Sequence, residues 1–259
     1  MDGQNGETRI GSIPTNLRML LVLEEIAQSG VPVTPTEVNQ RIGLPKPTIH
    51  RLFATLEAEG FIMRELDGKS YTPGKRLRRL SINVLSSLRV RTARLAVLGR
   101  LAAEVGETCN IAVPERDARV YLDRVETKWP LRIQLPVGTH VPFYCTASGK
   151  MYLSSLNEAH LERYLRAEQF VQHTATTLTS VDALRNEIAL TRERGYSEDA
   201  EEFMEGMIAS ACPSLDDQDR LLSTVSFHAP TVRLSLDSAR RHVDRLRAAA
   251  LELSRLMLI

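Results

Sequence analysis

The stretch from residue 35 to residue 61 constrains this chain most, because it combines a short helical pattern, a tight turn and a longer amphipathic helix. Gly43 ends the first of these helices, and a glycine can take the left-handed conformation in which many helices terminate. In the second helix the apolar residues recur at the spacing of one buried face: Ile49, Leu52, Phe53 and Leu56. The start of the same helix is polar and basic and has no acidic residue, as a helix that enters the major groove of DNA requires. The stretch predicts a helix-turn-helix.

Two neighbouring segments favour a winged form of this motif over an ordinary helical hairpin. Residues 17–28 have the apolar spacing of a helix that can cover the back of the pair. Residues 61–71 have the pattern of a short hairpin, with Asp67 and Gly68 as a two-residue turn. We therefore predict a winged helix-turn-helix domain over residues 13–75. Its candidate DNA contacts are Lys46, Thr48, His50 and Arg51 in the recognition helix and Arg64 and Lys69 in the wing.

The charge distribution supports DNA binding only when it is followed along the chain. The whole protein has a formal net charge of +1. Residues 1–94 hold 14 Lys and Arg against 9 Asp and Glu, whereas residues 95–259 hold 19 against 23. Residues 75–94 contain seven basic residues and no acidic one. Phosphate contacts need such a basic footprint, although a solvated linker helix would also explain Arg89, Arg91 and Arg94.

The length of 259 residues, of which 43% are apolar, is enough for two domains with cores of their own. No apolar run approaches the length of a membrane span, and residues 1–9 lack the apolar centre of a signal peptide. Cys109, Cys145 and Cys212 are widely separated, which favours reduced thiols in the cytoplasm over a disulfide framework. Residues 1–12 have the polar composition of a disordered tail.

The second part of the chain has the pattern of an α+β domain, over residues 95–259. Before it, residues 76–94 predict a linker helix, within an apolar helical run over residues 77–101 that we expect to contact a partner subunit. The predicted strands are residues 108–113, 119–126, 131–135, 195–199, 207–212 and 221–228, and the predicted helices are residues 146–156, 161–166, 181–193 and 237–258. This order predicts a largely antiparallel sheet with helices packed on it.

Three motifs relate the chain to a known family. They are residues 43–52 with residues 55–61, then residues 142–150, and then residues 192–196 followed by Glu201, Glu202 and Gly206. With these motifs in this order, the chain resembles the IclR family of bacterial transcriptional regulators along nearly its full length. The resemblance implies an N-terminal winged helix-turn-helix, a C-terminal GAF-like effector-binding domain, and a homodimer or a dimer of dimers. It also implies a repressor or activator that binds double-stranded operator DNA and senses a small carboxylic or aromatic acid.

The resemblance also carries effector-binding positions to this chain. They fall on Ala147 and Ser148 at a helix start and on Asp199, Ala209, Ser226 and His228 in the later strands. Two positions depart from the family: Ala209 replaces a frequent cysteine, and His228 lies in a segment that usually ends in Ser-Gly-Pro. A His228 side chain that faces a pocket would pair with a carboxylate or a phenol. Alternatively, it is a strand-end histidine bonded to the backbone.

Thr146 joins this set on a physical argument. Residues 146–149 are small and begin a predicted helix, so that free backbone N–H groups and the helix dipole favour an anion there. Thr146 and Ser148 add hydroxyl groups. Plain capping of the helix by either hydroxyl is the alternative interpretation.

The sequence has no catalytic motif, and we predict neither enzymatic activity nor a bound cofactor. It contains no HExxH, no CxxC, no Gly-rich phosphate loop and no Gly-x-Ser-x-Gly. The leading interpretation is a ligand-responsive DNA-binding regulator. The alternative is a metal- or redox-sensing regulator on the same scaffold, with Cys145, Cys212 and His228 assembled in space as its site.

Overall fold

The computed structural model describes residues 13–85, 88–115, 118–130, 132–133 and 135–257. Contacts between Cα atoms divide the chain into two compact units, which meet at residues 85 and 86. The expected tail over residues 1–12 lies outside the described residues. None of the described helices combines the length and the apolar character needed to cross a membrane.

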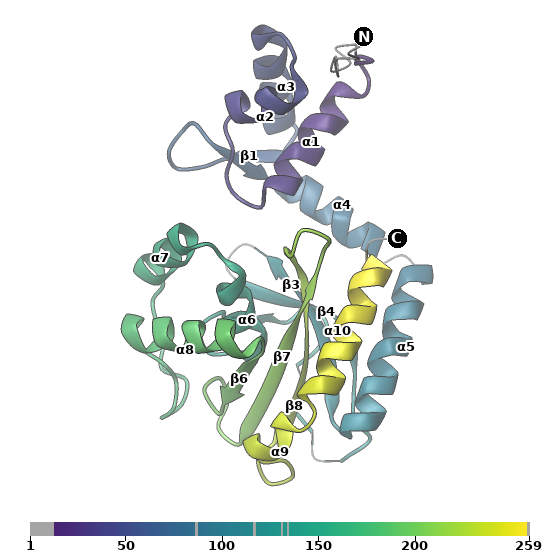
Figure 1. The fold of residues 1–259 in the computed structure, drawn as a ribbon, viewed down its shortest axis with the longest axis vertical. Coiled ribbons are helices and arrows are strands. Elements are labelled where there is room, and N and C mark those ends of the chain that lie inside the picture. Colours follow the sequence, from purple (N-terminus) through teal and green to yellow (C-terminus); the bar gives the residue numbers. More distant parts are fainter. Residues whose placement is uncertain (1–12, 86–87, 116–117, 131, 134, 258–259) are drawn as a thin grey trace, which may run out of the picture. The chain divides into compact units, whose positions relative to one another are not determined.

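The first unit is a winged helix-turn-helix, with its elements in the predicted order (Figure 1). These elements are α1 (Arg18–Ser29), α2 (Pro35–Ile42), α3 (Lys46–Ala58), β1 (Ile62–Arg64), β2 (Tyr71–Pro73) and α4 (Lys75–Leu85). The apolar stripe predicted for α3 is confirmed, because Ile49, Leu52, Phe53 and Leu56 all lie in the core of this unit. Val22 and Ile26 of α1 and Val38 of α2 lie in the same core, which also contains Leu44, Ile62 and Tyr71.

Local contacts fix the turn that separates α2 from α3. Thr34 and Glu37 form a reciprocal capping box at the start of α2. At its end Gly43 is left-handed, with φ of 73°. The Asn39 side chain then holds both backbone groups of Leu44, donating to the carbonyl at 2.8 Å and accepting from the N–H at 2.9 Å. These bonds set the direction in which α3 leaves the turn.

The prediction of a two-residue turn in the wing is wrong. Strand pairing ends at Arg64 and Tyr71, so the connecting loop spans residues 65–70. The Asp67 carboxylate organises this loop by accepting from the backbone N–H groups of Lys69 and Ser70 and from the Ser70 hydroxyl. These hydrogen bonds lower the pKa of Asp67 to about 2. Asp67 and Gly68 therefore form part of a longer loop, stabilised by a side chain.

The apolar run predicted as one helix over residues 77–101 corresponds to two described helices. α4 ends at Leu85 and α5 spans Leu88–Val105, while residues 86–87 between them lie outside the described residues. α5 packs against α10 (Val243–Met257), β3 (Thr108–Glu115) and β4 (Ala118–Val125). Because of these contacts α5 belongs to the second unit, which starts before residue 95.

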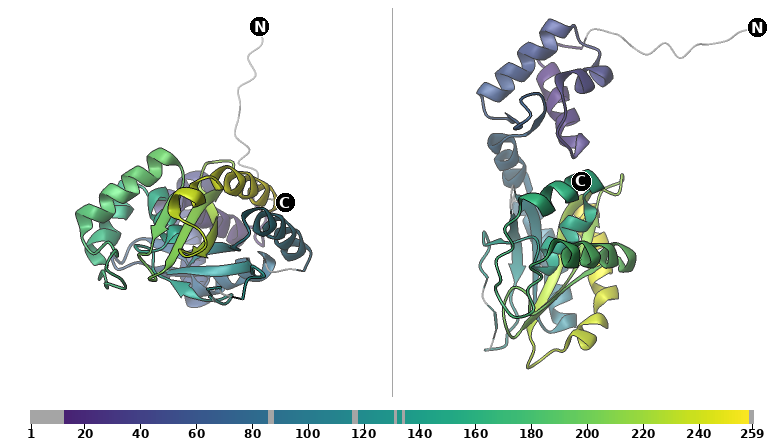
Figure 2. Two further views of the ribbon diagram at one scale, coloured as in Figure 1. Left: turned by 90° about the horizontal axis from the view of Figure 1, so that it is seen from below. Right: turned by 90° about the vertical axis from the view of Figure 1, so that its left-hand side faces the viewer.

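The second unit is a six-stranded antiparallel sheet between two layers of helices (Figures 1 and 2). Its strand order is β5-β4-β3-β8-β7-β6. The further strands are β5 (His140–Val141), β6 (Ser197–Ala200), β7 (Met207–Leu215) and β8 (Leu221–Pro230). The further helices are α6 (Ala147–Ser155), α7 (Glu158–Ala167), α8 (Val181–Arg194) and α9 (Leu236–Arg240). α5 and α10 lie side by side on one face, and α6, backed by α8, packs on the other.

Two predictions in this unit are wrong in detail. Of the strand predicted over residues 131–135, the described residues Arg132, Ile133 and Leu135 lie in no strand. The carbonyl groups of Ile133 and Leu135 accept hydrogen bonds from the Arg124 side chain instead of a strand neighbour. The single helix predicted over residues 237–258 is interrupted after Arg240, giving α9 and α10.

Candidate functional site

The candidate DNA-reading surface is the start of α3. Lys46, His50 and Arg51 are exposed there and Thr48 is half-buried. No acidic residue occurs in the first turn of α3. The helix buries its opposite stripe, so these side chains remain available to base edges and phosphates. The structure therefore leaves Lys46, His50 and Arg51 exposed at the start of α3, and their contact with DNA stays a prediction.

The two predicted wing residues differ in how they are held. The Arg64 guanidinium makes two bonds to the Glu57 carboxylate of α3, at 3.0 and 2.7 Å, and a third to the Gly68 carbonyl. It also lies over the Tyr71 ring. Lys69 is exposed at the loop, and its amino group pairs with no described residue. Arg64 thus braces the wing against α3, whereas Lys69 is available to a phosphate.

Part of the basic run over residues 75–94 forms ion pairs with acidic residues of the protein itself. Arg76 pairs with Glu59 of α3 at 2.7 Å. Arg94 is fully buried and pairs with the buried Asp123 of β4 at 2.7 Å, and Arg91 pairs with the other oxygen of Asp123 at 3.1 Å. Neither the phosphate footprint nor the solvated linker describes Arg94, because its guanidinium is buried in an ion pair with the sheet, and Arg91 pairs with the same carboxylate.

The predicted effector residues of the later strands lie on one face of the sheet. Asp199 of β6 pairs with Ala209 of β7, and Ala209 pairs with His228 of β8. Ser226 is two positions from His228 on β8, and therefore points to the same face. All four side chains are buried. Residues far apart in the sequence thus form one continuous patch.

The start of α6 covers this patch. Ala147 and Met151 of α6 pack against Ala209 and Ala211 of β7. The Thr146 hydroxyl caps the helix, accepting from the Gly149 N–H at 3.1 Å and donating to the Pro142 carbonyl at 2.7 Å. The capping alternative therefore describes Thr146. The buried Ser148 hydroxyl, in contrast, has no hydrogen-bond partner among the described residues.

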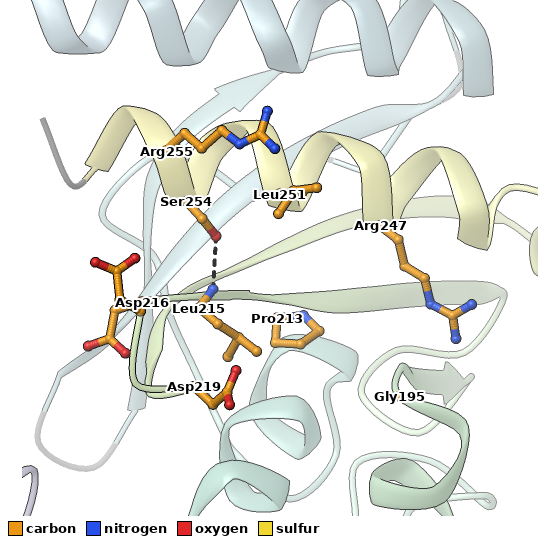
Figure 3. Close-up of a pocket in the computed structure, with 10 residues that line it drawn as sticks. Gly195, Pro213, Leu215, Asp216, Asp219, Arg247, Leu251, Ser254 and Arg255 are labelled. Carbon is orange, nitrogen blue, oxygen red and sulfur yellow. Dashed lines mark hydrogen bonds between the residues drawn. The ribbon is translucent and has the colours of Figure 1, made fainter.

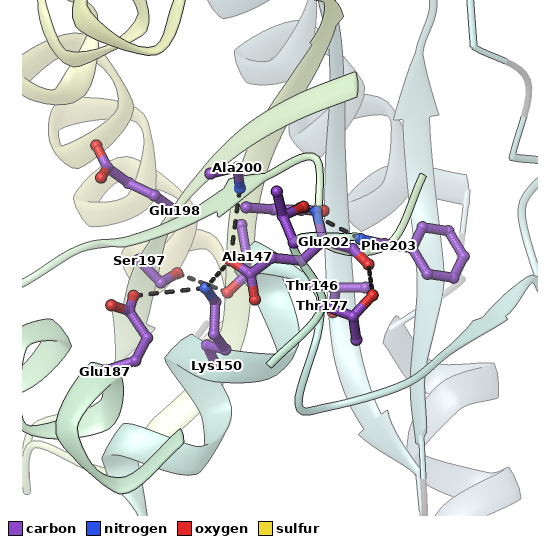
Figure 4. A network of polar contacts seen from close by, with 12 residues as sticks. Thr146, Ala147, Lys150, Thr177, Glu187, Ser197, Glu198, Ala200, Glu202 and Phe203 are labelled. Carbon is purple, nitrogen blue, oxygen red and sulfur yellow. Dashed lines mark hydrogen bonds and ion pairs between the residues drawn. The ribbon is translucent and has the colours of Figure 1, made fainter. Parts of the chain in front are cut away.

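A buried ionic network borders the patch (Figure 4). The Lys150 amino group of α6 is 1% exposed and pairs with Glu202 and, at 3.4 Å, with Glu187 of α8. Asp199 accepts the backbone N–H groups of Glu202 and Phe203 through Oδ1. Burial, reinforced by the charge of Glu202, raises the pKa of Asp199 to about 7. Near neutral pH this carboxyl is therefore partly protonated.

His228 is held by residues that the sequence did not single out. Its Nδ1 lies 3.2 Å from the Asn110 side-chain nitrogen, and its Nε2 lies 3.4 Å from the Ile133 carbonyl. Burial, reinforced by the charge of Arg124, lowers the pKa of His228 to about 4. The ring is thus neutral at pH 7, with Nε2–H donating to Ile133 and Nδ1 accepting from Asn110. The bond to the Ile133 carbonyl fits the backbone-bonded alternative. That His228 pairs with a carboxylate or a phenol stays a prediction.

Several buried polar groups on this face have no protein partner. Asp199 Oδ2 and Asn110 Oδ1 are buried and accept no hydrogen bond. The hydroxyl groups of Ser148 and Ser226 have no partner among the residues that the structure describes. Buried polar groups are usually satisfied, so these two oxygens and two hydroxyl groups on one face of the sheet and on α6 indicate a place for a polar ligand. Asn110 is polar within an apolar strand, which is the only signal that could have identified it from the sequence.

The metal-sensing site is not assembled. Cys212 faces the α10 side of the sheet, whereas His228 is on the α6 side, since the two lie at positions of opposite parity in the paired strands. All three cysteines are buried and free. No group of three or more His, Cys, Asp or Glu side chains within the described ranges could hold a metal ion. Burial also raises the pKa of Cys212 to about 12, which disfavours the reactive thiolate.

A separate pocket of about 480 Å³ lies on the α10 side of the second unit (Figure 3). Arg247, Leu251 and Ser254 of α10 line it, facing Leu215 of β7 and the acidic turn after β7. The Leu215 N–H donates to the Ser254 hydroxyl at 2.9 Å and closes its floor. It contains none of the predicted effector residues.

Comparison with known proteins gives consistent matches over both units. The IclR helix-turn-helix domain matches residues 17–65, and the bacterial transcriptional regulator IclR C-terminal domain matches residues 82–255. The chain is 37% identical to the probable transcriptional regulator SauR of Cupriavidus necator, over 92% of this chain and 94% of SauR. It is 30% identical to the transcriptional repressor IclR of Escherichia coli, over 88% of this chain and 84% of that protein. These relatives are regulators of transcription, not enzymes.

Solved structures agree with the fold. The crystal structure of Thermotoga maritima IclR matches with a TM-score of 0.63 and 26% identity, covering 94% of this chain and 98% of that one. An IclR homologue from Microbacterium hydrocarbonoxydans, complexed with 4-hydroxybenzoate, matches with a TM-score of 0.60 and 24% identity, covering 95% and 99%. At that identity the second match shows the fold alone.

Proposed function

Because the chain belongs to the IclR family of bacterial transcriptional regulators, we propose that it reads operator DNA with α3 and the β1–β2 wing and senses a small organic acid between α6 and the sheet. The observation that carries the effector site is a set of unpaired polar groups: the buried oxygens Asn110 Oδ1 and Asp199 Oδ2, and the hydroxyl groups of the buried residues Ser148 and Ser226. An acid would supply acceptors to the hydroxyl groups and, when it carries a hydroxyl or a proton, a donor to the two oxygens. The proposed setting is the cytoplasm, where operator DNA lies.

A thermal-shift screen of carboxylic and aromatic acids tests this proposal. The screen includes 4-hydroxybenzoate, which the homologue from Microbacterium hydrocarbonoxydans binds. A ligand at a hundred times its dissociation constant should add about 2.7 kcal/mol to the free energy of unfolding. A screen in which no acid shifts the unfolding temperature would count against an acid effector.

Ser226→Val should weaken effector binding by about 10- to 100-fold, because a hydrogen bond to a charged group contributes about 1.5–3 kcal/mol. The matched control is Ser223→Val on the same strand, since Ser223 faces the opposite side of the sheet and bonds Met257 of α10. Isothermal titration with a hit from the screen measures both variants. Equal losses in the two variants would place the effector elsewhere.

Arg51→Ala should weaken operator binding by about 1–3 kcal/mol if its guanidinium contacts a guanine. Fluorescence anisotropy with operator and random duplexes measures the loss, and Arg163→Ala, an exposed arginine of α7, controls for the change of charge. An equal loss on both duplexes would assign Arg51 to a phosphate, not to a base.

Lys69→Ala should weaken binding to every sequence alike and reduce the slope of log K against log salt by about one unit. Lys69 has this role because it is exposed and unpaired, whereas Arg64 is held by Glu57. Anisotropy titrations at several salt concentrations measure the slope. A wing that stays off the DNA would leave the slope unchanged.

We also propose a homodimer or a dimer of dimers, because two recognition helices about 34 Å apart read a palindromic site. α4 offers a contact surface, since Leu80 and Val84 on it are 53% and 62% exposed. Sedimentation equilibrium of the protein and of Val84→Glu tests the assignment. A wild-type monomer at micromolar concentration would argue against the dimer, and an unchanged assembly in the variant against the role of α4.

A further inference from the structure

Arg119 of β4 is a fully buried cation with no counter-ion among the residues that the structure describes. Its side chain is 0% exposed, and its Nη2 donates to the Ala112 carbonyl and, at 2.7 Å, to the Thr224 hydroxyl. The guanidinium carbon lies 5.7 Å from the centre of the Tyr152 ring. Nε and Nη1 donate to nothing. A guanidinium has five N–H donors, so most of its capacity is unused.

Other buried basic side chains of the described residues are paired. Arg94 pairs with Asp123, and Lys150 pairs with Glu202 and Glu187. A buried charge without a partner is costly, and burial lowers the pKa of Arg119 to about 9, which still leaves it protonated at neutral pH. A protein retains such a group when something else supplies the negative charge.

Because of the position of Arg119, a negative charge that pairs with it would lie beyond Ser226, at one end of the patch formed by Asp199, Ala209, Ser226 and His228. Its side chain starts on β4, crosses Ala112 of β3 and reaches Thr224 of β8. Thr224 and Ser226 are two residues apart on the same face of β8, about 7 Å along the strand. On α6, Tyr152 lies four residues beyond Ser148, about 6 Å along the helix. On β8 the residues from Ser226 to Thr224, and on α6 those from Ser148 to Tyr152, therefore both lead towards the Arg119 guanidinium.

We propose that Arg119 binds a second anionic group of the effector, which is consequently a small organic dianion and not a monocarboxylic acid. This inference rests on the proposed effector site. One anionic group would lie at Ser148 and Ser226, and the other would accept from Nε and Nη1 of Arg119 in the two-pronged geometry that arginine offers to carboxylate and phosphate. The separation of the two anchors suits a four- or five-carbon chain. An effector of this kind would neutralise the buried guanidinium when it binds.

Matched ligand pairs test the proposal by isothermal titration: butyrate against succinate, pentanoate against glutarate, and benzoate against terephthalate. The phosphonate analogue of succinate, 3-phosphonopropionate, distinguishes a second carboxylate from a phosphate-like group. We expect at least one dianion to bind at least tenfold more tightly than its monoanionic partner. Arg119→Met should bring that ratio close to one by weakening only the dianion, and Arg119→Lys should retain part of the preference.

The outcomes separate this inference from the proposed function. Monoanions that bind as well as dianions, with Ser226→Val still weakening their binding, would overturn the role of Arg119 and leave the effector site in place. A dianion preference that persists in Arg119→Met would overturn it as well. If no acid of either kind binds, both proposals fail. Should Arg119→Met not fold, the wild-type ratio and Arg119→Lys decide the question.

Discussion

Gly149→Ala should lower the free energy of unfolding by about 3 kcal/mol or more, the upper end of what overpacking costs. A Cβ atom at this position would lie closer than 3.0 Å to the carbonyl oxygen, Cα and carbonyl carbon of Phe143. These are backbone atoms, which cannot rotate away as a side chain does. Gly149 is therefore the residue that lets α6 lie close to the chain that precedes it.

Gly99→Ala in α5 is the matched control. Nothing lies within 4 Å of a Cβ built on Gly99, and alanine is favoured over glycine inside a helix by about 0.5–1 kcal/mol. The same substitution should thus stabilise the protein at one helical glycine and destabilise it at the other. Urea denaturation measures both. A change of less than 1 kcal/mol in Gly149→Ala would show that α6 shifts freely on the sheet.

The free energy of unfolding of the wild-type protein should fall as the pH rises from acidic to neutral. In Asp199→Asn this fall should be absent. The pKa of Asp199 rises from 3.8 to about 7 on folding, chiefly through burial. Between these values the folded state binds more protons than the unfolded state, so stability falls as pH rises and levels off above pH 7. At 1.36 kcal/mol per pKa unit, the full shift corresponds to about 4 kcal/mol. Asparagine can still accept the N–H groups of Glu202 and Phe203 through its oxygen.

Denaturation at pH 4.5 and at pH 8 measures this effect. The variant should exceed the wild type by about 1 kcal/mol at the lower pH, which already lies above the unfolded-state pKa of 3.8, and by about 4 kcal/mol at the higher pH. Asp217→Asn, at an exposed position in the turn after β7, should leave the wild-type pH dependence unchanged. A wild-type profile that is flat over this range would show that Asp199 stays ionised in the fold.

Local sequence signals were enough for the first unit. The stripe of Ile49, Leu52, Phe53 and Leu56 and the glycine after Ile42 depend on residues a few positions apart, and the structure confirms both. The length of the wing loop was missed because it depends on the Asp67 side chain, which accepts three hydrogen bonds from Lys69 and Ser70 and so stabilises a longer loop.

In the second unit, long-range contacts override local pattern. Residues 131–135 are apolar enough for a strand, but Arg124 takes the carbonyl groups of Ile133 and Leu135, and the edge is formed by His140 and Val141. The family resemblance located Asp199, Ala209, Ser226 and His228, and the register places them together. The resemblance could not identify Asn110 or Arg119. What distinguishes them is that some of their buried polar atoms have no hydrogen-bond partner, and this is visible only in the folded structure.

The central ladder of the sheet joins its earliest strand to its last, with Thr108 opposite His228. During translation at about 5–20 residues per second, β3 and β4 must wait roughly 6 to 24 seconds before β8 leaves the ribosome. The winged helix-turn-helix has no such dependence, since the residues of its described core all lie within the first 85 residues. The nascent chain therefore has a complete DNA-reading unit while its sensing unit still lacks β8, the strand that pairs with β3 in the middle of the sheet. A message truncated before residue 221 would yield a reader that no effector can regulate.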